Sequence, residues 1–425
     1  MYSTELRQKL ADGRLSAYGH LYADVPAQTL RYQKAIDAFE ARYGKDRDLL
    51  LFSVPGRSEL LGNHTDHNHG MVMAGAIDRD IIAVVSLNGT NTIHLKSEGF
   101  DEDVICLEEI DQPEHFKHYT SAALIAGVCH AFAERGIMLQ GFDAYTTTEV
   151  QKGSGISSSA AFEVMCGNIL NHLFAKGQMS PETLAKMAQY AENVYFGKPC
   201  GLMDQMACAV GGFVQIDFAN PQNPIVTPIT FSLSDAGYSL CIVNTGGNHA
   251  NLNDDYASVP AEMKAVAKAL GCTVLRETTE ANVLAMAATL RETLGDRAIL
   301  RALHFFRENE RVAHGAEALQ KGDVDTFLSQ VMASGASSFT YLQNVYTTQN
   351  VEEQGLSLAL CVTAGVLKQK QAAYRVHGGG FAGTIQAFVR HEDVDVYKAE
   401  MDRIFGQGAT MELSIRPLGA VQIVL

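Results

Sequence analysis

Residues 144–170 read AYTTTEVQKGSGISSSAAFEVMCGNIL, and they join a strand pattern to a helix pattern through a glycine- and serine-rich loop. The threonine run suits a pleated strand over Ala144–Val150. From Phe162 the apolar residues recur at i, i+3, i+4, i+7, i+8 and i+11, which predicts a helix over about 158–175. Ser157 or Ser158 is the expected N-cap of that helix. The free N–H groups and the helix dipole at this point favour a phosphate, and a turn that only caps the helix is the alternative.

The composition of the chain narrows the class of protein. Its 425 residues carry 33 Lys and Arg against 48 Asp and Glu, a net charge of −15, and no basic stripe for a nucleic-acid partner. No apolar run approaches the roughly 18 residues of a membrane span. The start of the chain lacks the apolar block of a secretory signal. The eight cysteines form no CxxC pair, which indicates thiols in a reducing compartment, and we expect the cytoplasm.

Helix and strand patterns alternate along the chain, which predicts an α+β protein with about two or three domains. Residues 1–45 are expected to be helical, and Leu49–Val54 is expected to be a strand that stops at Pro55-Gly56. Strands at Ile81–Leu87 and Thr92–Lys96 are expected to pair as a hairpin through Asn88-Gly89. Strand patterns give way to helices near 215–250.

A second polar stretch, PGRSELLGNHTDHNHG at 55–70, follows the first predicted strand. Its Asn, His and Asp side chains offer both donors and acceptors, as sugar hydroxyls require. A metal cluster of His64, Asp66, His67 and His69 is a second interpretation, and an exposed polar loop is a third.

Two further stretches carry chemistry. Glu192 falls on the apolar face of a helix predicted over 181–195, where a carboxylate needs a cation or metal partner. Asp204 lies in a predicted turn between apolar residues, so it is a candidate base, although an Asp that only caps a helix is the alternative. The glycine run in HGGGFAG, residues 377–383, indicates close approach of the backbone to a ligand or to another loop.

Taken in order, these four stretches resemble the motifs of the GHMP small-molecule kinases, and within them those of the galactokinase family. The likeness spans about residues 35–425. It implies an N-terminal domain like ribosomal protein S5 domain 2 and a C-terminal ferredoxin-like domain, with the site between them. We therefore expect an N-terminal helical extension at 1–34, an N-terminal kinase domain at 35–235 and a C-terminal kinase domain at 236–425.

The resemblance also implies an activity, an ATP- and Mg²⁺-dependent phosphotransfer to the anomeric hydroxyl of a sugar, with galactose as the expected acceptor. Asp204 and Arg57 match the catalytic residues, and Ser158 and Glu192 match the Mg²⁺ ligands. The nucleotide phosphate loop is matched by Gly153, Ser154, Gly155, Ile156, Ser157, Ser158 and Ser159. The sugar-binding residues are matched by Asn63, His64, Asp66, Tyr256 and Gly379.

The stretch at 55–70 departs from the family motif at three residues, of which Asn63 touches the sugar end of the site, and the glycine run departs from its motif at His377 and Ala382. Glu59 stands where the family has Asn, Asn63 where it has Glu, and His67 where it has Tyr. A related sugar (N-acetylgalactosamine, L-arabinose or galacturonate) is therefore a second candidate substrate. A kinase for a non-sugar alcohol is a third interpretation, and a non-catalytic sugar- and ATP-binding sensor is a fourth. The expected partners are a small sugar and ATP, without nucleic acid or membrane, on a monomer or weak homo-oligomer.

Overall fold

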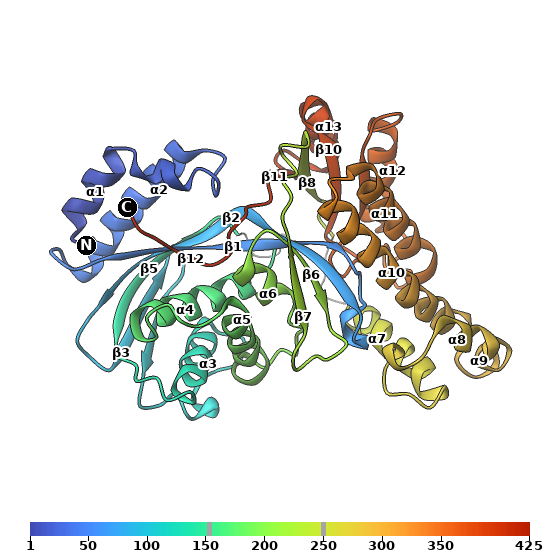
Figure 1. Cartoon of the computed structure of the whole chain (residues 1–425), viewed down its shortest axis with the longest axis horizontal. Coiled ribbons are helices and arrows are strands. Elements are labelled where there is room, and N and C mark those ends of the chain that lie inside the picture. The colour runs from blue at the N-terminus through green and yellow to red at the C-terminus, as the bar shows by residue number, and fades with distance from the viewer. Residues whose placement is uncertain (151–154, 248–251) are drawn as a thin grey trace.

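A computed structural model describes residues 1–150, 155–247 and 252–425, and it is an α+β fold built on two sheets (Figure 1). The larger sheet has eight strands in the order β12-β1-β2-β5-β3-β4, with β6 and β7 continuing from the far end of β2. Its strands are β1 Leu50–Leu61, β2 Met71–Leu87, β3 Thr92–Ser97, β4 Glu102–Cys106, β5 Phe142–Thr148, β6 Phe213–Asp217, β7 Ile225–Ile229 and β12 Val421–Ile423. The expected fold class is confirmed.

Helices cover both faces of the larger sheet (Figure 1). One face carries α3 (Ser121–Ala133), α4 (Ser158–Phe174), α5 (Pro181–Tyr190) and α6 (Met203–Val210), which share the main hydrophobic core with the strands. The opposite face carries α1 (Ser3–Ala11), the 3₁₀ turn Arg14–Tyr18 and α2 (Val25–Tyr43). Leu6, Ile36 and Phe39 of these segments pack against Leu51, Ile82 and Val84 of the sheet. The N-terminal segment is thus a layer of this fold.

The smaller sheet has the order β11-β8-β10-β9, with β8 Tyr238–Asn244, β9 Ala373–His377, β10 Thr384–Arg390 and β11 Thr410–Leu413. Alternate residues of β10 face opposite sides. Ile385, Ala387 and Val389 pack with α12 (Gly355–Val366) and α13 (His391–Phe405), while Phe388 packs on Phe327 of α11 (Val324–Ser337). Gln386 points the same way as Phe388 and reaches β1. The face of the smaller sheet that carries Gln386 and Phe388 therefore contacts the larger sheet through a polar side chain.

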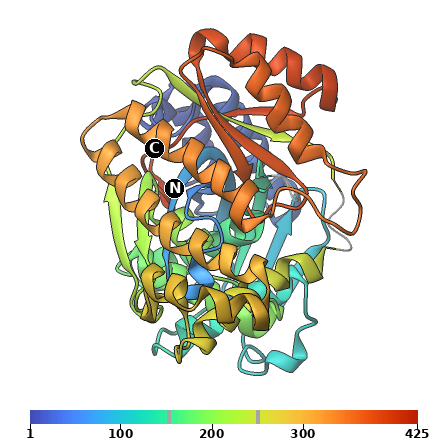
Figure 2. The same cartoon turned by 90° about the vertical axis from the view of Figure 1, so that its right-hand side faces the viewer.

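The remaining helices lie on the side that faces the viewer in Figure 2. They are α7 Asn253–Ala269, α8 Glu280–Ala285, α9 Ala287–Leu294 and α10 Asp296–Gln320, followed by α11. Apolar residues of α7 and α10, among them Met263 and Ala302, belong to a separate hydrophobic core. This confirms the predicted helical region between about 254 and 335.

Two local predictions were wrong. Strand β1 does not stop at Pro55-Gly56 but continues to Leu61, with shifts of register at Pro55/Arg57 and at Glu59/Leu61. The strands flanking Asn88-Gly89 do not pair as a hairpin, because β5 lies between β2 and β3, antiparallel to the first and parallel to the second. The turn forms, with Gly89 at a φ of 71°, but long-range pairing with β5 decides the neighbours.

Of the two domain divisions, the one at 235/236 falls in the connection between β7 and β8, and the one at 34/35 falls inside α2. Both stay proposals. All eight cysteines are free thiols. None of the helices in the described ranges is both long enough and apolar enough to cross a membrane.

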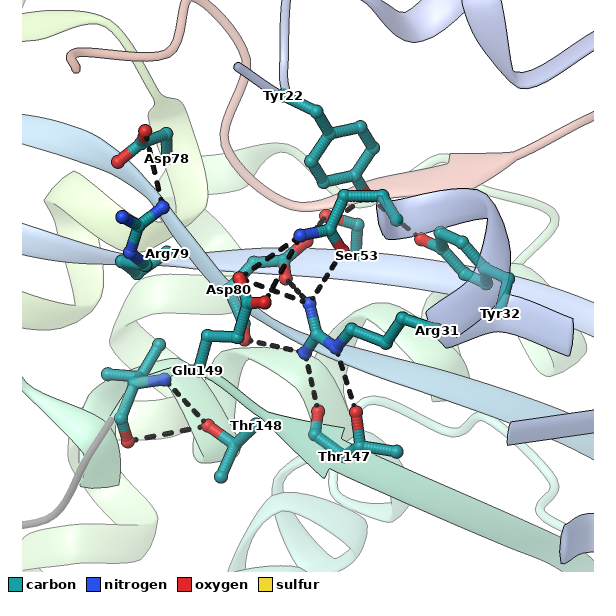
Figure 3. A network of polar contacts seen from close by, with 12 residues as sticks. Tyr22, Arg31, Tyr32, Ser53, Asp78, Arg79, Asp80, Thr147, Thr148 and Glu149 are labelled. Carbon is teal, nitrogen blue, oxygen red and sulfur yellow. Dashed lines mark hydrogen bonds and ion pairs between the residues drawn. The ribbon is translucent and has the colours of Figure 1, made fainter. Parts of the chain in front are cut away.

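A buried ionic network ties the N-terminal helices to the larger sheet (Figure 3). Asp80 of β2 accepts from Arg31 of α2 at 2.6 Å and from the hydroxyl of Tyr22 at 3.1 Å. It also binds the hydroxyl of Ser53, and Arg416 near the end of the chain lies 3.4 Å away. Arg31 and Arg416 hold the pKa of Asp80 below its usual value, against the opposing effect of burial. One carboxylate therefore joins both ends of the chain to the sheet.

Candidate active site

Arg57 and Asp204 form a bidentate ion pair although 147 positions separate them in the chain. Arg57 Nε donates to Asp204 Oδ1 and Nη2 donates to Oδ2, both at 2.7 Å. Arg57 comes from β1, just after its first register shift, and Asp204 is the second residue of α6. The predicted turn at Asp204 was wrong, because the residue lies in the first turn of a helix. The fold thus brings together the two residues expected to be catalytic.

Asp204 is an ionised carboxylate at neutral pH. Burial would raise its pKa, but the charge and hydrogen bonds of Arg57 and a hydrogen bond from Ser157 together lower it. Ser157 occupies the predicted N-cap position of α4 with a left-handed φ of 61°, and its hydroxyl binds Asp204 instead of a helix N–H. A left-handed non-glycine residue costs of order 1–3 kcal/mol. This conformation directs the start of α4 toward the carboxylate.

The described part of the expected phosphate loop is fastened to β1. Arg57 donates through its backbone N–H to Ile156 O at 3.1 Å and through Nη1 to Gly155 O at 2.7 Å. The approach needs a glycine in β1, because a Cβ on Gly56 would lie 2.6 Å from Ile156 O. Gly155 has a φ of 76°. Gly153 and Ser154 lie outside the described residues.

Glu192 is buried, as its helical spacing predicted, in the π-helical turn Ala191–Phe196 that follows α5. Its Oε1 accepts from Ser159 Oγ at 3.3 Å and from Lys198 Nζ at 3.0 Å, and its Oε2 accepts from Gln205 Nε2 at 2.7 Å. Ser158, its expected partner as a metal ligand, is the residue before Ser159. Glu192 therefore presents carboxylate oxygens beside the N-terminus of α4.

A second carboxylate, Glu163 of α4, lies next to Glu192 and is fully buried. Gln205 Nε2 donates to it at 3.1 Å as well, and burial together with the charge of Glu192 raises its pKa well above the usual value. Glu163 Oε1 and Gln205 Oε1 have no hydrogen-bond partner within the described residues. Mg²⁺ takes oxygen ligands from one or two carboxylates and from phosphates, so this donor set fits the ion.

Four of the five expected sugar-binding residues, Asn63, His64, Asp66 and Gly379, line a cavity of about 170 Å³ beside Arg57. The fifth, Tyr256, contacts Gly379 but does not line the cavity. This volume is below the roughly 300–1,000 Å³ of pockets for drug-sized ligands, so it suits a small polar molecule. The lining residues are Arg57, Glu59, Gly62, Asn63, His64, Asp66, His67, Val72, Met203, Gly378 and Gly379. No group of three or more His, Cys, Asp or Glu within the described ranges is placed to hold a metal ion, which disfavours the metal interpretation of residues 64–69.

His64 is a neutral side chain in this cavity. Burial lowers its pKa to about 4, and its Nε2 donates to Gly379 O at 2.9 Å. The neutral ring then offers Nδ1 as an acceptor. Asp66 is held close to the loop before α6, since a Cβ on Gly201 would lie 2.5 Å from its Oδ2. The cavity therefore has acceptors on two nearby residues.

The glycine run approaches other parts of the protein, one of its two predicted uses. A Cβ on Gly379 would lie 2.6 Å from Tyr256 Cε1, and one on Gly380 would collide with Asn344 O. Tyr256 donates from its hydroxyl to Gly380 O at 2.8 Å. Gly379 O also accepts from Asn344 Nδ2 at 3.0 Å. Tyr256 thus supports the turn that forms one wall of the cavity.

Glu59 and Asn63, two of the residues that depart from the family motif, contact each other. Asn63 Nδ2 donates to Glu59 Oε1 at 3.0 Å and to Gly378 O at 2.7 Å. Arg375 of β9 donates to the same Glu59 oxygen at 3.3 Å and to Leu60 O at 2.9 Å. The amide of Asn63 and the carboxylate of Glu59 therefore form one hydrogen-bonded unit, with its negative charge at position 59.

This contact predicts that a substitution at position 59 or position 63 is tolerated only when the other position is changed as well. Asn63→Glu places two carboxylates in contact, and Glu59→Asn removes the partner of Arg375. We expect each single substitution to lower kcat/KM for the sugar by about 10- to 100-fold. The double substitution should restore part of this loss, which corresponds to a coupling free energy of about 1–3 kcal/mol between the two positions. Steady-state kinetics on the three variants measures this. Additive losses in the double variant would show that the two positions act independently.

His304 of α10 supports the same region. Its Nε2 donates to Asn63 O at 2.9 Å, and its Nδ1 lies 2.8 Å from Ser337 Oγ. Burial lowers its pKa from 6.5 to about 4, so the ring is neutral in the folded protein.

Protonation of His304 is expected to destabilise the fold in acid. The unfolded chain binds this proton below pH 6.5, whereas the folded chain does not bind it until about pH 4. Stability is therefore lost as the pH falls through that window, by on the order of 1 kcal/mol per pH unit. The free energy of unfolding of wild type and His304→Gln, measured from pH 8 to 4, should converge in acid. Parallel curves would contradict the assignment.

Several residues of the site were not predicted from the sequence. Gln205 directly follows Asp204 and Lys198 lies six residues after Glu192, and the need of a buried carboxylate for donors is the signal that could have found them. Arg375, Gln386 and Asn344 carried no such signal. Gln386 Nε2 reaches Leu60 O at 3.2 Å, and Asn344 Nδ2 reaches Asn63 Oδ1 at 2.7 Å, across 326 and 281 positions of the chain.

Comparison with solved structures shows which fold this is. The chain superposes on the galactokinase of Lactococcus lactis complexed with galactose with a TM-score of 0.75, at 22% identity, over 91% of this chain and 98% of that one. It superposes on a mevalonate kinase with a TM-score of 0.61, at 13% identity, over 87% and 99% of the two chains. Both are GHMP kinase folds.

Comparison of sequences shows the family. The model of the GHMP kinases N terminal domain matches residues 123–212, and the galactokinase galactose-binding signature matches residues 37–87. The chain is 31% identical to a galactokinase of Actinobacillus pleuropneumoniae, over 85% of this chain and 91% of the relative. It is 32% identical to the galactokinase of Streptomyces coelicolor over 376 residues, 88% of this chain and 92% of the relative. The chain belongs to the galactokinase family of GHMP kinases.

Proposed function

We propose that this chain transfers the γ-phosphoryl group of ATP to the anomeric hydroxyl of galactose, giving galactose 1-phosphate and ADP. The observation that supports it most is the Arg57–Asp204 pair, which lies between the start of α4 and a small polar cavity. Phosphoryl transfer needs positioned charge more than covalent help, and this arrangement supplies it. The proposal includes action in the cytoplasm, as a monomer or weak homo-oligomer.

Asp204 is the proposed acceptor of the C1 hydroxyl proton. Each of its oxygens keeps lone-pair capacity beyond the bonds from Arg57 and Ser157. Because its pKa is lowered, Asp204 orients the hydroxyl first and takes the proton as the new bond forms. Arg57, held in a fixed plane by Gly155 O and Asp204, stabilises negative charge on the transferring group. The two residues then act as one unit.

The nucleotide and its metal have separate proposed positions. Gly155 to Ser159 and the N-terminus of α4 would hold the phosphates through backbone N–H groups, together with Gly153 and Ser154. Ser158 and Glu192 would hold Mg²⁺ with oxygen ligands. The ion, when bound, would neutralise charge on the phosphates. Glu192 is kept in place by Gln205, whose Nε2 also donates to Glu163.

Galactose is the preferred acceptor among the related sugars. The cavity holds two carboxylates, Glu59 and Asp66, which would repel the carboxylate of galacturonate. The proposed hydroxyl ligands are His64, Asp66 and Asn63, with Gly379 in the wall and Tyr256 supporting it through Gly380. A non-catalytic sensor would not need the Arg57–Asp204 pair.

Coupled ADP release with Mg·ATP tests the proposal against galactose, N-acetylgalactosamine, L-arabinose, galacturonate and mevalonate. We expect galactose to give the highest kcat/KM, and phosphorus NMR to place the phosphate at C1. A higher kcat/KM for another sugar would reassign the substrate and keep the mechanism. Binding of ATP without turnover on any acceptor would favour the sensor.

A further inference from the structure

Lys198 holds an ammonium group at the entrance to the buried carboxylates of the site. It lies in the loop between the π-helical turn Ala191–Phe196 and α6, and its Nζ is 3.0 Å from Glu192 Oε1. Its side chain is 56% exposed, whereas that of Glu192 is 3% exposed. Its backbone N–H also donates to Glu192 O at 3.1 Å. The backbone of Lys198 is thus anchored, while its charged end is free to turn toward solvent.

Two buried carboxyl groups, those of Glu192 and Glu163, lie close together beyond Lys198. Glu163 and Glu192 share one donor, Gln205 Nε2. In the described ranges, Lys198 is the one cationic side chain within ion-pair distance of either carboxylate. A divalent ion on Glu192 Oε1 would compete with the ammonium group, because that oxygen already accepts from both Lys198 and Ser159, while Oε2 accepts from Gln205.

The N-terminus of α4 is the nearest alternative position for the ammonium group. Ser159 Oγ and Lys198 Nζ both reach Glu192 Oε1, so they lie within two hydrogen-bond lengths of each other. A lysine has a flexible four-carbon stem, and a change of rotamer is enough to move its charge over this distance. The free N–H groups there favour phosphate, and a phosphate oxygen would accept from the released ammonium group.

We propose that Lys198 is a phosphate-binding residue that exchanges partners. It pairs with Glu192 when the site holds no metal, and a divalent cation on Glu192 releases it to the phosphates of the nucleotide. This inference rests on the proposed positions of ATP and Mg²⁺ and adds a residue that contacts the phosphates. Lys198 would then link metal binding to nucleotide binding.

Two binding measurements test the exchange without relying on turnover. Electron paramagnetic resonance of Mn²⁺ alone should show that Lys198→Met binds the ion about fivefold more tightly than wild type, since a half-exposed ion pair no longer competes. Calorimetry with Mg·ATP should show binding about tenfold weaker, from the loss of one charge-assisted hydrogen bond. Lys198→Arg, which keeps the charge, should stay near wild type in both.

Controls separate the outcomes. Glu192→Gln should itself weaken Mn²⁺ binding, because Glu192 is the proposed ligand of the ion. Unchanged affinity for both ligands in Lys198→Met, with an unchanged melting temperature, would reduce Lys198 to a surface ion pair and overturn the inference. Tighter Mn²⁺ binding with unchanged Mg·ATP binding would overturn its phosphate contact. If wild type phosphorylates no sugar but both shifts appear, the proposed function fails and the exchange stands.

Discussion

Asp204→Asn is expected to lower kcat by about 1,000-fold or more, within the range of lost general base catalysis and lost electrostatic stabilisation. The amide cannot take the proton of the C1 hydroxyl. It also cannot hold Arg57 through two charged contacts of 2.7 Å. Because Asn keeps the shape of Asp, the cavity and the start of α4 should persist. Coupled assays at saturating galactose and ATP measure the loss.

Asp217→Asn is the matched control, since Asp217 of β6 pairs with Arg276 at 2.9 Å outside the site. Its kcat should stay within about twofold of wild type, as for a partly exposed ion pair. Calorimetry with Mg·ATP checks that Asp204→Asn still binds nucleotide. A kcat within about tenfold of wild type in Asp204→Asn would show that this carboxylate only positions Arg57.

Asp80→Ala is expected to cost about 3–5 kcal/mol in the free energy of unfolding, because it leaves buried guanidinium groups without a counter-charge. Arg416 is fully buried, and Arg31 donates to Asp80 at 2.6 Å (Figure 3). Loss of the carboxylate also removes one of the two hydrogen-bond partners of the Tyr22 hydroxyl, leaving that of Tyr32. Chemical denaturation measures the change, and limited proteolysis should show release of α1 and α2 before the rest of the chain.

The exposed pair Glu317–Lys321, at the C-terminal end of α10, is the control for this experiment. Glu317→Gln should leave the denaturation midpoint where it is in wild type, because solvent screens such a pair. A loss below about 1 kcal/mol in Asp80→Ala would contradict the network, since it would mean that water reaches Arg416 once the carboxylate is gone.

Local sequence was sufficient where short-range forces decide structure. The apolar face of α4 was predictable from a period of 3.6, and the burial of Glu192 followed from its place on such a face. Ser157 occupies the predicted N-cap position, but its hydroxyl makes no capping hydrogen bond, because it binds Asp204. The hairpin at Asn88-Gly89 failed because turn chemistry selects a turn but does not select which strand pairs beyond it. Strand β5, 55 positions further on, supplied the partner.

The sequence by itself determined the chemistry that this protein carries: an anion-binding loop before α4, a polar stretch on β1, a carboxylate at 204 and a glycine turn at 378–380. Only the tertiary structure decided the partners of these groups. Arg57 meets Asp204, Glu59 meets Arg375, and Glu192 meets Lys198. The physical reason is that a side chain's type is local, whereas its ionisation and hydrogen bonds depend on which distant groups are buried beside it.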